Sequence, residues 1–386
     1  MNRIIMIKGP VETLSYFSMQ MALYYRQQGY DIFFWDMYAP LESRESFDAL
    51  EPCCETALIT FNFIGLSGES QFEYEDDESI FDAAGIRKVC IMVDHPMYYE
   101  KQITEYGNEI TMFCVDRDHC KYIERYFGIS GVGFCPLAGT FSGCAGIPLH
   151  EREINVLFAG NYVSLEGLKK HLEPLSEEFR EYMLLMAEDL IANPSRTIEE
   201  EAYIRLNEDF PDSTFEEQRD FMHNMVFVDL YVRSFYRRKV ILELAGNGIR
   251  VDVIGKDWEL AGCSAPENIV SHGIMDSQGC IDMMRKSRVS INVMPWFKNG
   301  THDRIYNSLF NGCALVTDSS EYLDEMGVSR WAYTYSLTDI SKLPDIVREI
   351  LNDIDNCREI KGCTDEFMKD NSWEARAEAI AKWASL

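Results

Sequence analysis

Short apolar runs alternate with longer amphipathic stretches along this chain. Residues 3–8 and 31–36 are strand-like, and residues 12–28 between them carry apolar side chains at helical spacing up to Gly29. This order predicts a βαβ unit. Further strand-like runs follow at residues 57–64, 88–93, 111–115 and 133–136, with a helical stretch at 117–127. The pattern predicts a Rossmann-like α/β domain over residues 1–150.

The alternation of strand-like and helical segments resumes after residue 153. Residues 154–159 are strand-like, and a long acidic helical region from about 165 to 238 is interrupted near Pro194 and Pro211. Later strand-like runs lie at residues 250–254, 269–271, 290–294 and 313–317. We therefore expect a second Rossmann-like domain over residues 151–386, with a helical insertion at about 165–235 and an amphipathic terminal helix at 372–386. The predicted fold class is α/β, with the two domains facing each other across a cleft.

The stretch from 290 to 320 contains strand, polar loop, helix and second strand. Pro295 ends the first strand, and Ile305, Leu309 and Phe310 recur at helical spacing before Gly312. Free N–H groups and the positive end of the helix dipole favour an anion at such a helix start. The residues there are Gly300, Thr301, His302, Asp303 and Arg304. They predict a nucleoside diphosphate site, whereas the alternative interpretation is helix capping alone.

Composition limits the kind of partner. A formal charge of −28 over 386 residues argues against a nucleic-acid backbone or an anionic membrane as the main partner, so an anionic ligand needs a local positive site. No apolar segment approaches the roughly 20 residues that span a bilayer. The apolar run at the start is too short for the hydrophobic region of a signal peptide. The twelve cysteines show no C-x-x-C spacing and no pairing with the seven histidines. We expect reduced thiols, a cytoplasmic location and no metal site.

Two polar residues follow the apolar run at 89–93, where Pro96 stops the strand. Asp94 and His95 should emerge at the carboxyl end of that strand and are candidate acid–base residues. The alternative is a solvated turn with a capping Asp. At the first strand, Gly9-Pro10 is not a G-x-G-x-x-G turn, which argues against a dinucleotide-binding dehydrogenase.

Other candidates for the ligand site lie in the second half. Gly160 and Asn161 end the strand at 154–159, where a small residue and an amide suit close approach and sugar binding, or simply a tight turn. Arg237 belongs to the densest basic group, which could balance a diphosphate or pair with the acidic insertion. After the strand at 250–254, Gly255 and Lys256 could approach phosphate. Trp258 could form an aromatic wall or pack beneath the loop.

Four segments together resemble a known family of enzymes. They are Phe-Ala-Gly-Asn at 158–161, Arg-Val-Asp-Val-Ile-Gly-Lys-Asp-Trp at 250–258, Asn-Ile-Val-Ser-His-Gly at 268–273 and Gly-Thr-His-Asp-Arg-Ile-Tyr-Asn at 300–307. The chain resembles glycosyltransferases of the GT-B fold, above all the CgeB-like group, named for a spore-maturation protein, with its "group 1" glycosyltransferase carboxyl-terminal domain. The resemblance covers about residues 155–386. In the amino-terminal half its main point is Val-Asp-His-Pro at 93–96.

The resemblance implies a nucleotide-sugar donor, with a UDP-sugar favoured, held by the carboxyl-terminal domain. It implies an acceptor held by the amino-terminal domain, and catalysis without metal or cofactor. His272, Gly273 and Ile274 fall where related enzymes bind the nucleobase. Asn307 stands where the wider group usually has a Glu that bonds the donor ribose, and an amide can still form such a bond. The implied catalytic residues are Asp94, His95 and Arg304.

We expect transfer of a sugar to a hydroxyl group on a glycan, a protein or a small molecule. Arg304, Lys256 and the helix start would stabilise the leaving diphosphate. A GT-B-type epimerase or phosphate-ester enzyme could use the same donor pocket. A non-catalytic sugar-nucleotide-binding protein is the third alternative, which Asn307 keeps open. The sequence leaves the acceptor, the stereochemical outcome and the oligomeric state undefined.

Overall fold

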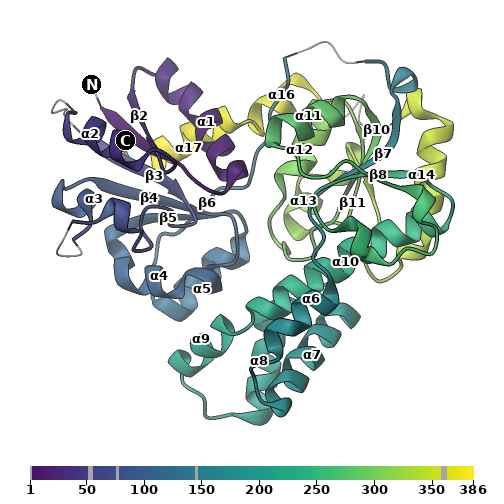
Figure 1. Cartoon of the computed structure of the whole chain (residues 1–386), viewed down its shortest axis with the longest axis horizontal. Helices are drawn as coiled ribbons and strands as arrows, with labels where there is room; N and C mark the ends of the chain where they lie inside the picture. Colours follow the sequence, from purple (N-terminus) through teal and green to yellow (C-terminus); the bar gives the residue numbers. More distant parts are fainter. Residues whose placement is uncertain (1, 51–54, 75–77, 144–146, 358–362) are drawn as a thin grey trace. The chain divides into compact units, whose positions relative to one another are not determined.

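The computed structural model describes residues 2–50, 55–74, 78–143, 147–357 and 363–386. They form two compact units (Figure 1). The first contains residues 1–138 and 369–386, and the second contains residues 139–368. Among the described residues, no helix is both long and apolar enough to cross a membrane.

The first unit is built on a six-stranded parallel sheet. Its strand order is β2-β1-β3-β4-β5-β6, and Ile5 on β1 lies opposite Phe33 on β2 and Leu58 on β3. The strands are β1 Arg3–Lys8, β2 Asp31–Asp36, β3 Thr56–Phe61, β4 Arg87–Met92, β5 Ile110–Cys114 and β6 Gly133–Phe134. The helices are α1 Glu12–Gln27, α2 Pro40–Asp48, α3 Ile80–Ala83, α4 Glu100–Tyr106, α5 Arg117–Phe127 and α17 Trp373–Trp383.

The terminal helix α17 packs in the first unit, whereas the sequence placed residues 372–386 in the second domain. The Trp373 ring lies 4.3 Å from the Phe17 ring on α1, between ring centroids. The Tyr25 hydroxyl donates to the Ala377 carbonyl at 3.2 Å. Helix α17 therefore buries its apolar face, which includes Ile380, against α1. Spacing along the sequence reveals that face but not its partner.

The second unit has its own six-stranded parallel sheet, in the order β12-β11-β10-β7-β8-β9. The strands are β7 Ile154–Ala159, β8 Val251–Ile254, β9 Ile269–Ser271, β10 Ser287–Asn292, β11 Ala314–Thr317 and β12 Tyr333–Thr334. On β7, Val156 and Phe158 enter one core cluster, and Leu157 and Ala159 enter another. The sheet is thus buried on both faces, which explains its continuous apolar strands. The two-residue edge strand β12 was not predicted, because two residues show no periodicity.

Helices cover both faces of this sheet and form the insertion between β7 and β8 (Figure 1). They are α6 Leu165–Lys169, α7 Glu177–Ala192, α8 Ile198–Asp209, α9 Phe215–His223, α10 Val226–Gly246, α11 Ser277–Arg285, α12 Asp303–Phe310, α13 Glu321–Glu325, α14 Leu343–Asn352 and α16 Asp365–Asp370. Helix α7 ends two residues before Pro194 and α8 two residues before Pro211, because the residue before a proline disfavours helical backbone.

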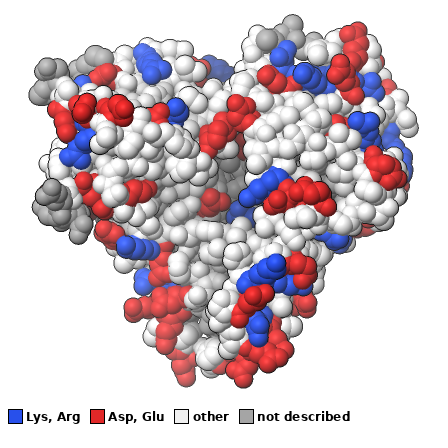
Figure 2. All heavy atoms as spheres, in the orientation of Figure 1, with Lys and Arg blue, Asp and Glu red and all other residues white. Residues whose placement is uncertain are grey.

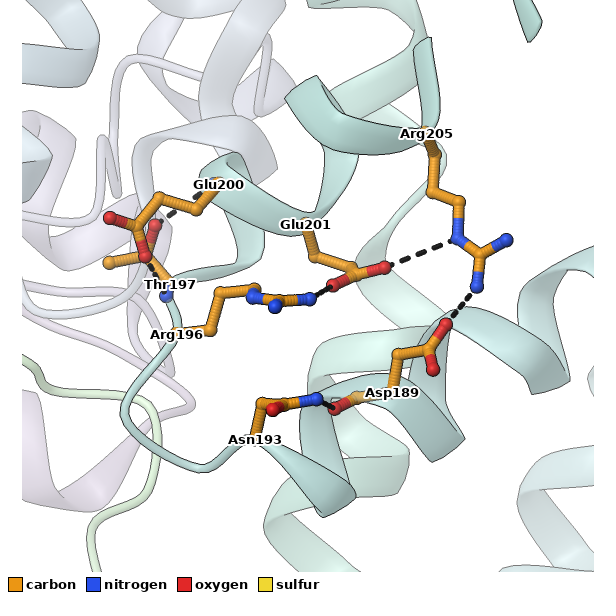
Figure 3. A network of polar contacts seen from close by, with 7 residues as sticks. All are labelled: Asp189, Asn193, Arg196, Thr197, Glu200, Glu201 and Arg205. Carbon is orange, nitrogen blue, oxygen red and sulfur yellow. Dashed lines mark hydrogen bonds and ion pairs between the residues drawn. The ribbon is translucent and has the colours of Figure 1, made fainter. Parts of the chain in front are cut away.

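An ion network joins the helices of the insertion (Figure 3). The Glu201 carboxylate is 1% exposed and accepts from Arg196 and, at 3.2 Å, from Arg205. Arg205 also pairs with Asp189 on α7, so α7 and α8 are tied together. Thr197 and Glu200 form a capping box at the start of α8. Acidic residues fill the first turns of α7, α8 and α9, where the helix dipole favours them, and Figure 2 shows Asp and Glu gathered over these helices.

Candidate functional site

Loops from neighbouring strands of the second unit meet at the carboxyl end of its sheet, which is where ligands bind in open α/β folds. The Gly160 N–H, after β7, donates to the Ile254 carbonyl at 2.8 Å. The Lys256 N–H, after β8, donates to Asn161 Oδ1 at 3.1 Å. The Gly255 N–H donates to the Gly273 carbonyl, after β9, at 2.7 Å. The predicted residues of three loops are therefore brought together.

Two glycines make this close approach of the loops possible. Gly255 has φ +128°, and a Cβ there would lie 2.5 Å from the Gly160 carbonyl oxygen. A Cβ on Gly160 would lie 3.2 Å from Nη2 of Arg304. The sequence predicted that these glycines admit a ligand. In the structure, the groups that approach them closely are a neighbouring loop and the Arg304 guanidinium.

Arg304 lies in the first turn of α12 and is 5% exposed. Its Nη1 donates to Asn292 Oδ1 at 2.6 Å, and its guanidinium carbon lies 5.1 Å from the centroid of the Phe158 ring. Burial lowers the pKa of Arg304, and the neighbouring Asp303 carboxylate opposes that shift. The charge is therefore held in one place by an amide and an aromatic ring before any ligand binds, as an anion site requires.

His302 and Asp303 form an ion-pair geometry at the same helix start, with 2.7 Å between His302 Nδ1 and Asp303 Oδ1. Burial, followed by the Arg304 charge, lowers the pKa of His302 to about 4. A neutral imidazole carries a single N–H. His302 Nδ1 also caps α12 by accepting from the Arg304 N–H at 3.2 Å, and His302 Nε2 lies 3.5 Å from Arg304 Nη2. Burial raises the pKa of Asp303, but His302 and Arg304 together lower it by more than burial raises it, so the carboxylate is charged.

Asn307 lies one turn further along α12 and is 8% exposed. Its Nδ2 donates to Asp303 Oδ2 at 2.9 Å, and its Oδ1 accepts from the Thr140 N–H at 2.8 Å. Both ends of the amide are thus bonded within the chain. These two bonds leave unused the second N–H of Nδ2 and the second lone pair of Oδ1. A Glu at this position could not donate to Asp303, which gives the departure from the family pattern a physical reason.

The loop before α12 is buried. Thr301 is 0% exposed, and within the described parts of the chain its Oγ1 has no hydrogen-bond partner. The Gly300 carbonyl accepts from Ser320 Oγ at 2.6 Å. Buried hydroxyls are normally bonded, so the Thr301 hydroxyl is a group to which a further partner could bind.

The remaining predicted residues of the β8 loop and α10 divide between surface and core. Trp258 is 2% exposed, packs on Phe158 and Tyr162 with ring centroids 5.5 Å away, and donates to the Gly160 carbonyl at 2.9 Å. Trp258 therefore packs beneath the loop, which was the second interpretation from the sequence, and does not form an aromatic wall. Lys256 is exposed. Arg237 donates to the Asn161 carbonyl at 3.0 Å, and its guanidinium lies 4.8 Å from the ring of Trp296.

The predicted nucleobase loop follows β9. His272 Nε2 lies 2.7 Å from Asp252 Oδ1, so its ring is attached to β8. Gly273 has φ +70° and turns the chain. Ile274 is 75% exposed, which leaves an apolar side chain at the surface of this loop. An exposed aliphatic group of this kind can cover one face of a planar base.

Two buried polar residues of the site were missed by the sequence analysis. Asn292 is 0% exposed, receives the Arg304 guanidinium and donates to Thr317 Oγ1 at 2.9 Å. Asp318 accepts from the Met294 N–H at 2.9 and 3.2 Å, and burial raises the pKa of Asp318 to about 7. The available signal was a polar residue at the end of an apolar strand, at 292 and again at 318.

Asp94 and His95 lie in the first unit, after β4. His95 is 5% exposed, its Nδ1 accepts from the Met97 N–H at 3.1 Å, and its ring packs on His119 and Tyr122. The lone pair of a neutral His95 is therefore already used, which disfavours it as a base. Asp94 is partly exposed, and its Oδ2 accepts from Asn62 Nδ2 at 3.0 Å. Of the two side chains, Asp94 is the more exposed.

Within the described ranges, no group of three or more His, Cys, Asp or Glu side chains is arranged to hold a metal ion.

Comparisons with known proteins establish the fold. No protein-family model matches the chain, and no curated protein matches it in sequence. Among solved structures, sucrose-phosphate synthase from Thermosynechococcus elongatus aligns at TM-score 0.57 and 8% identity, covering 100% of this chain and 98% of its own. An α-glucosyltransferase in complex with UDP aligns at TM-score 0.55 and 8% identity, covering 99% of each chain. The same coverage and TM-score, at 10% identity, hold for an α-glucosyltransferase in complex with UDP-glucose and DNA containing an abasic site. The chain has the two-unit α/β fold of GT-B glycosyltransferases, as its sequence predicted.

Proposed function

We propose that this protein is a glycosyltransferase that moves a sugar from a UDP-sugar to a hydroxyl-bearing acceptor without a bound metal. The observation that carries the proposal is Arg304, a buried cation fixed by Asn292 at the carboxyl end of the sheet and at the start of α12. An immobile charge beside helix N–H groups suits a pyrophosphate whose charge grows as the glycosidic bond breaks. The similar solved structures bound to UDP or UDP-glucose support this choice of donor.

In this proposal the second unit holds the donor. Arg304, Lys256 and Arg237 face the diphosphate, and the loop of His272, Gly273 and Ile274 receives the base. Thr301 and the N–H groups at His302 and Asp303 complete the phosphate site, and Gly160, Asn161, Gly255 and Gly300 shape it. Asn307 contacts the ribose through its second N–H or its second oxygen lone pair. Trp258 supports the loop from below.

The first unit holds the acceptor in this proposal, with Asp94 beside the reacting hydroxyl and His95 supporting the loop. The assignment to the CgeB-like group belongs to the proposal and rests on the four sequence segments. So does the exclusion of nucleic acid as a partner, which rests on the charge of −28.

The test is binding followed by turnover. Thermal unfolding is measured with UDP, GDP, ADP, CDP and TDP, and we expect selective stabilisation by UDP. UDP release from UDP-glucose is then measured with water and with a panel of sugar, peptide, small-alcohol and DNA acceptors. Stabilisation without UDP release from any UDP-sugar would favour the sugar-nucleotide-binding alternative. Interconversion of UDP-sugars without release would favour the epimerase. Release stimulated by DNA would contradict the charge argument.

A further inference from the structure

A strained turn lies at the end of β3 in the first unit. Asn62 has φ +52° and Phe63 has φ +56°, two consecutive residues other than glycine in the left-handed region. Asn adopts this conformation at small cost, but a bulky residue such as Phe rarely does. Such strain persists only where the surroundings enforce it, and it gathers at functional sites.

The contacts of these two residues show what enforces the turn. The Asn62 N–H donates to the Ile91 carbonyl at 3.0 Å, and Asn62 Oδ1 accepts from the Val93 N–H at 2.8 Å. Phe63 is 0% exposed, its N–H donates to Cys90 Sγ at 3.3 Å, and its ring lies 5.8 Å from that of Tyr99. Hydrogen bonds therefore join the turn to Cys90 and Ile91 on β4 and to Val93 just after β4.

One bond of Asn62 is not needed for the turn. Its Nδ2 donates to Asp94 Oδ2 at 3.0 Å, beyond the end of β4. A glycine would satisfy the left-handed backbone at lower cost, and the bond to Val93 needs only an oxygen. The amide N–H serves neither purpose, and its target is the carboxylate that the proposed function places beside the acceptor.

We propose that Asn62 is a positioning residue, which fixes the orientation of the Asp94 carboxylate toward an acceptor hydroxyl. The inference rests on the proposed function. A carboxylate with one oxygen held by a fixed donor loses rotational freedom before the acceptor arrives, so less freedom is lost on reaching the reactive geometry. Asn62 itself does not touch the reacting atoms.

Three single variants and one double variant test this role. Asn62→Gly relaxes the backbone and removes the amide. Asn62→Asp keeps the oxygen for Val93 and replaces the donor to Asp94 by a second carboxylate. Asp94→Asn removes the carboxylate, and the double variant Asn62→Asp with Asp94→Asn restores a hydrogen bond with donor and acceptor exchanged. Turnover is UDP release from UDP-glucose with the most active acceptor of the panel, or with water if none stimulates it. Stability is the urea midpoint.

Asn62→Gly loses the bond to the Val93 N–H but relieves the left-handed backbone, so we expect its urea midpoint to stay close to the parental value, while kcat falls at least ten-fold and the KM for UDP-glucose changes less than two-fold. Asn62→Asp should lose kcat similarly. The double variant should be more stable than the two single changes predict additively, yet stay as inactive as Asp94→Asn.

The outcomes separate the inference from the proposed function. Parental kcat in Asn62→Gly or Asn62→Asp, with Asp94→Asn impaired, would overturn the inference alone. A parallel loss of kcat and midpoint in Asn62→Gly would also overturn it, because the residue would then be purely structural. Parental kcat in Asp94→Asn would remove Asp94 from the proposed mechanism, and the inference with it. Absence of UDP release by the parent chain from every UDP-sugar would overturn both.

Discussion

Replacing Asn307 by Asp is the most direct test of the polar arrangement on α12. The two side chains have the same shape, and an Asp can still accept from the Thr140 N–H. The only bond removed is the one from Nδ2 to Asp303 Oδ2, at 2.9 Å. In its place two carboxylates face each other at a site where Asn307 is 8% exposed.

The expected cost follows from two terms. Loss of a hydrogen bond to a charged group costs about 1.5–3 kcal/mol. Repulsion between two unit charges about 4 Å apart reaches roughly 4 kcal/mol at an effective dielectric constant of about 20, and uptake of a proton by the pair limits it. We expect the free energy of unfolding to fall by about 2–4 kcal/mol at pH 8.

The loss of stability in Asn307→Asp depends on pH. Repulsion raises the folded-state pKa of one carboxyl of the new pair above its unfolded value, so the stability linked to that group is lost as pH rises through the raised pKa. The deficit of Asn307→Asp relative to the parent should therefore shrink as pH falls from 8 to 5. Urea unfolding at several pH values measures it.

A matched control exists on the surface of the same unit. Asn356 is exposed, and its Nδ2 donates to Asp353 Oδ1 at 2.8 Å. Asn356→Asp makes the same chemical change in solvent, where it should cost under about 0.5 kcal/mol. Parental stability of Asn307→Asp at pH 8 would refute the reasoning. So would a ten-fold gain in UDP affinity of Asn307→Glu at unchanged stability, because the position would then face the donor and not Asp303.

Three further predictions concern the same unit. Arg304→Ala should weaken UDP binding by about 2 kcal/mol and leave uridine binding nearly unchanged. Calorimetry measures both affinities, with the exposed Arg348→Ala as control. Equal losses for both ligands would show that Arg304 has a structural role. UDP release should survive excess EDTA, because the proposed site neutralises pyrophosphate with its own charges; loss of activity restored by Mn²⁺ or Mg²⁺ would contradict this. Burial raises the pKa of Asp318 to about 7 from an ordinary value of 3.8, so the stability linked to its proton is full below pH 3.8 and lost as pH rises through 7. Asp318→Asn should remove that decline in urea unfolding between pH 4 and 8, and an unchanged profile would show that Asp318 does not titrate there.

Apart from β12, the strands of both sheets could be predicted because their apolar periodicity is local. Strand β10 begins at Ser287, three residues before the predicted strand, because Ser287 and Arg288 give no apolar signal. The last helix has a local apolar face as well, yet its partner α1 lies at the other end of the sequence. Pattern therefore identified the helix and could not assign it to a unit.

The meeting of loops at one edge of the sheet was predictable, because the backbone alone determines it. Gly160 and Gly255 lie at strand ends, and strand ends of one parallel sheet share an edge. Trp258 and Asn307 show the opposite case. Whether a tryptophan lines a pocket or packs beneath it depends on side chains from other segments, here Phe158 and Tyr162. The bond from Asn307 to Thr140 joins residues far apart in sequence, and no spacing rule reveals it.

The charges at the start of α12 also limit which groups could stabilise a leaving diphosphate there. Burial and the Arg304 charge lower the pKa of His302 to about 4, so the imidazole is neutral at pH 7. His302 therefore cannot act as a proton-donating imidazolium. Asp303 is charged and lies beside the neutral His302. Its negative charge cancels the positive charge of Arg304, so these two side chains together contribute no net charge. The net positive potential must then come from the helix N–H groups and from basic residues of neighbouring loops, of which Lys256 is exposed and adjacent. In the proposed reaction, Arg304 acts as a fixed hydrogen-bond donor of defined direction, and the excess charge that draws in the donor lies with Lys256 and Arg237.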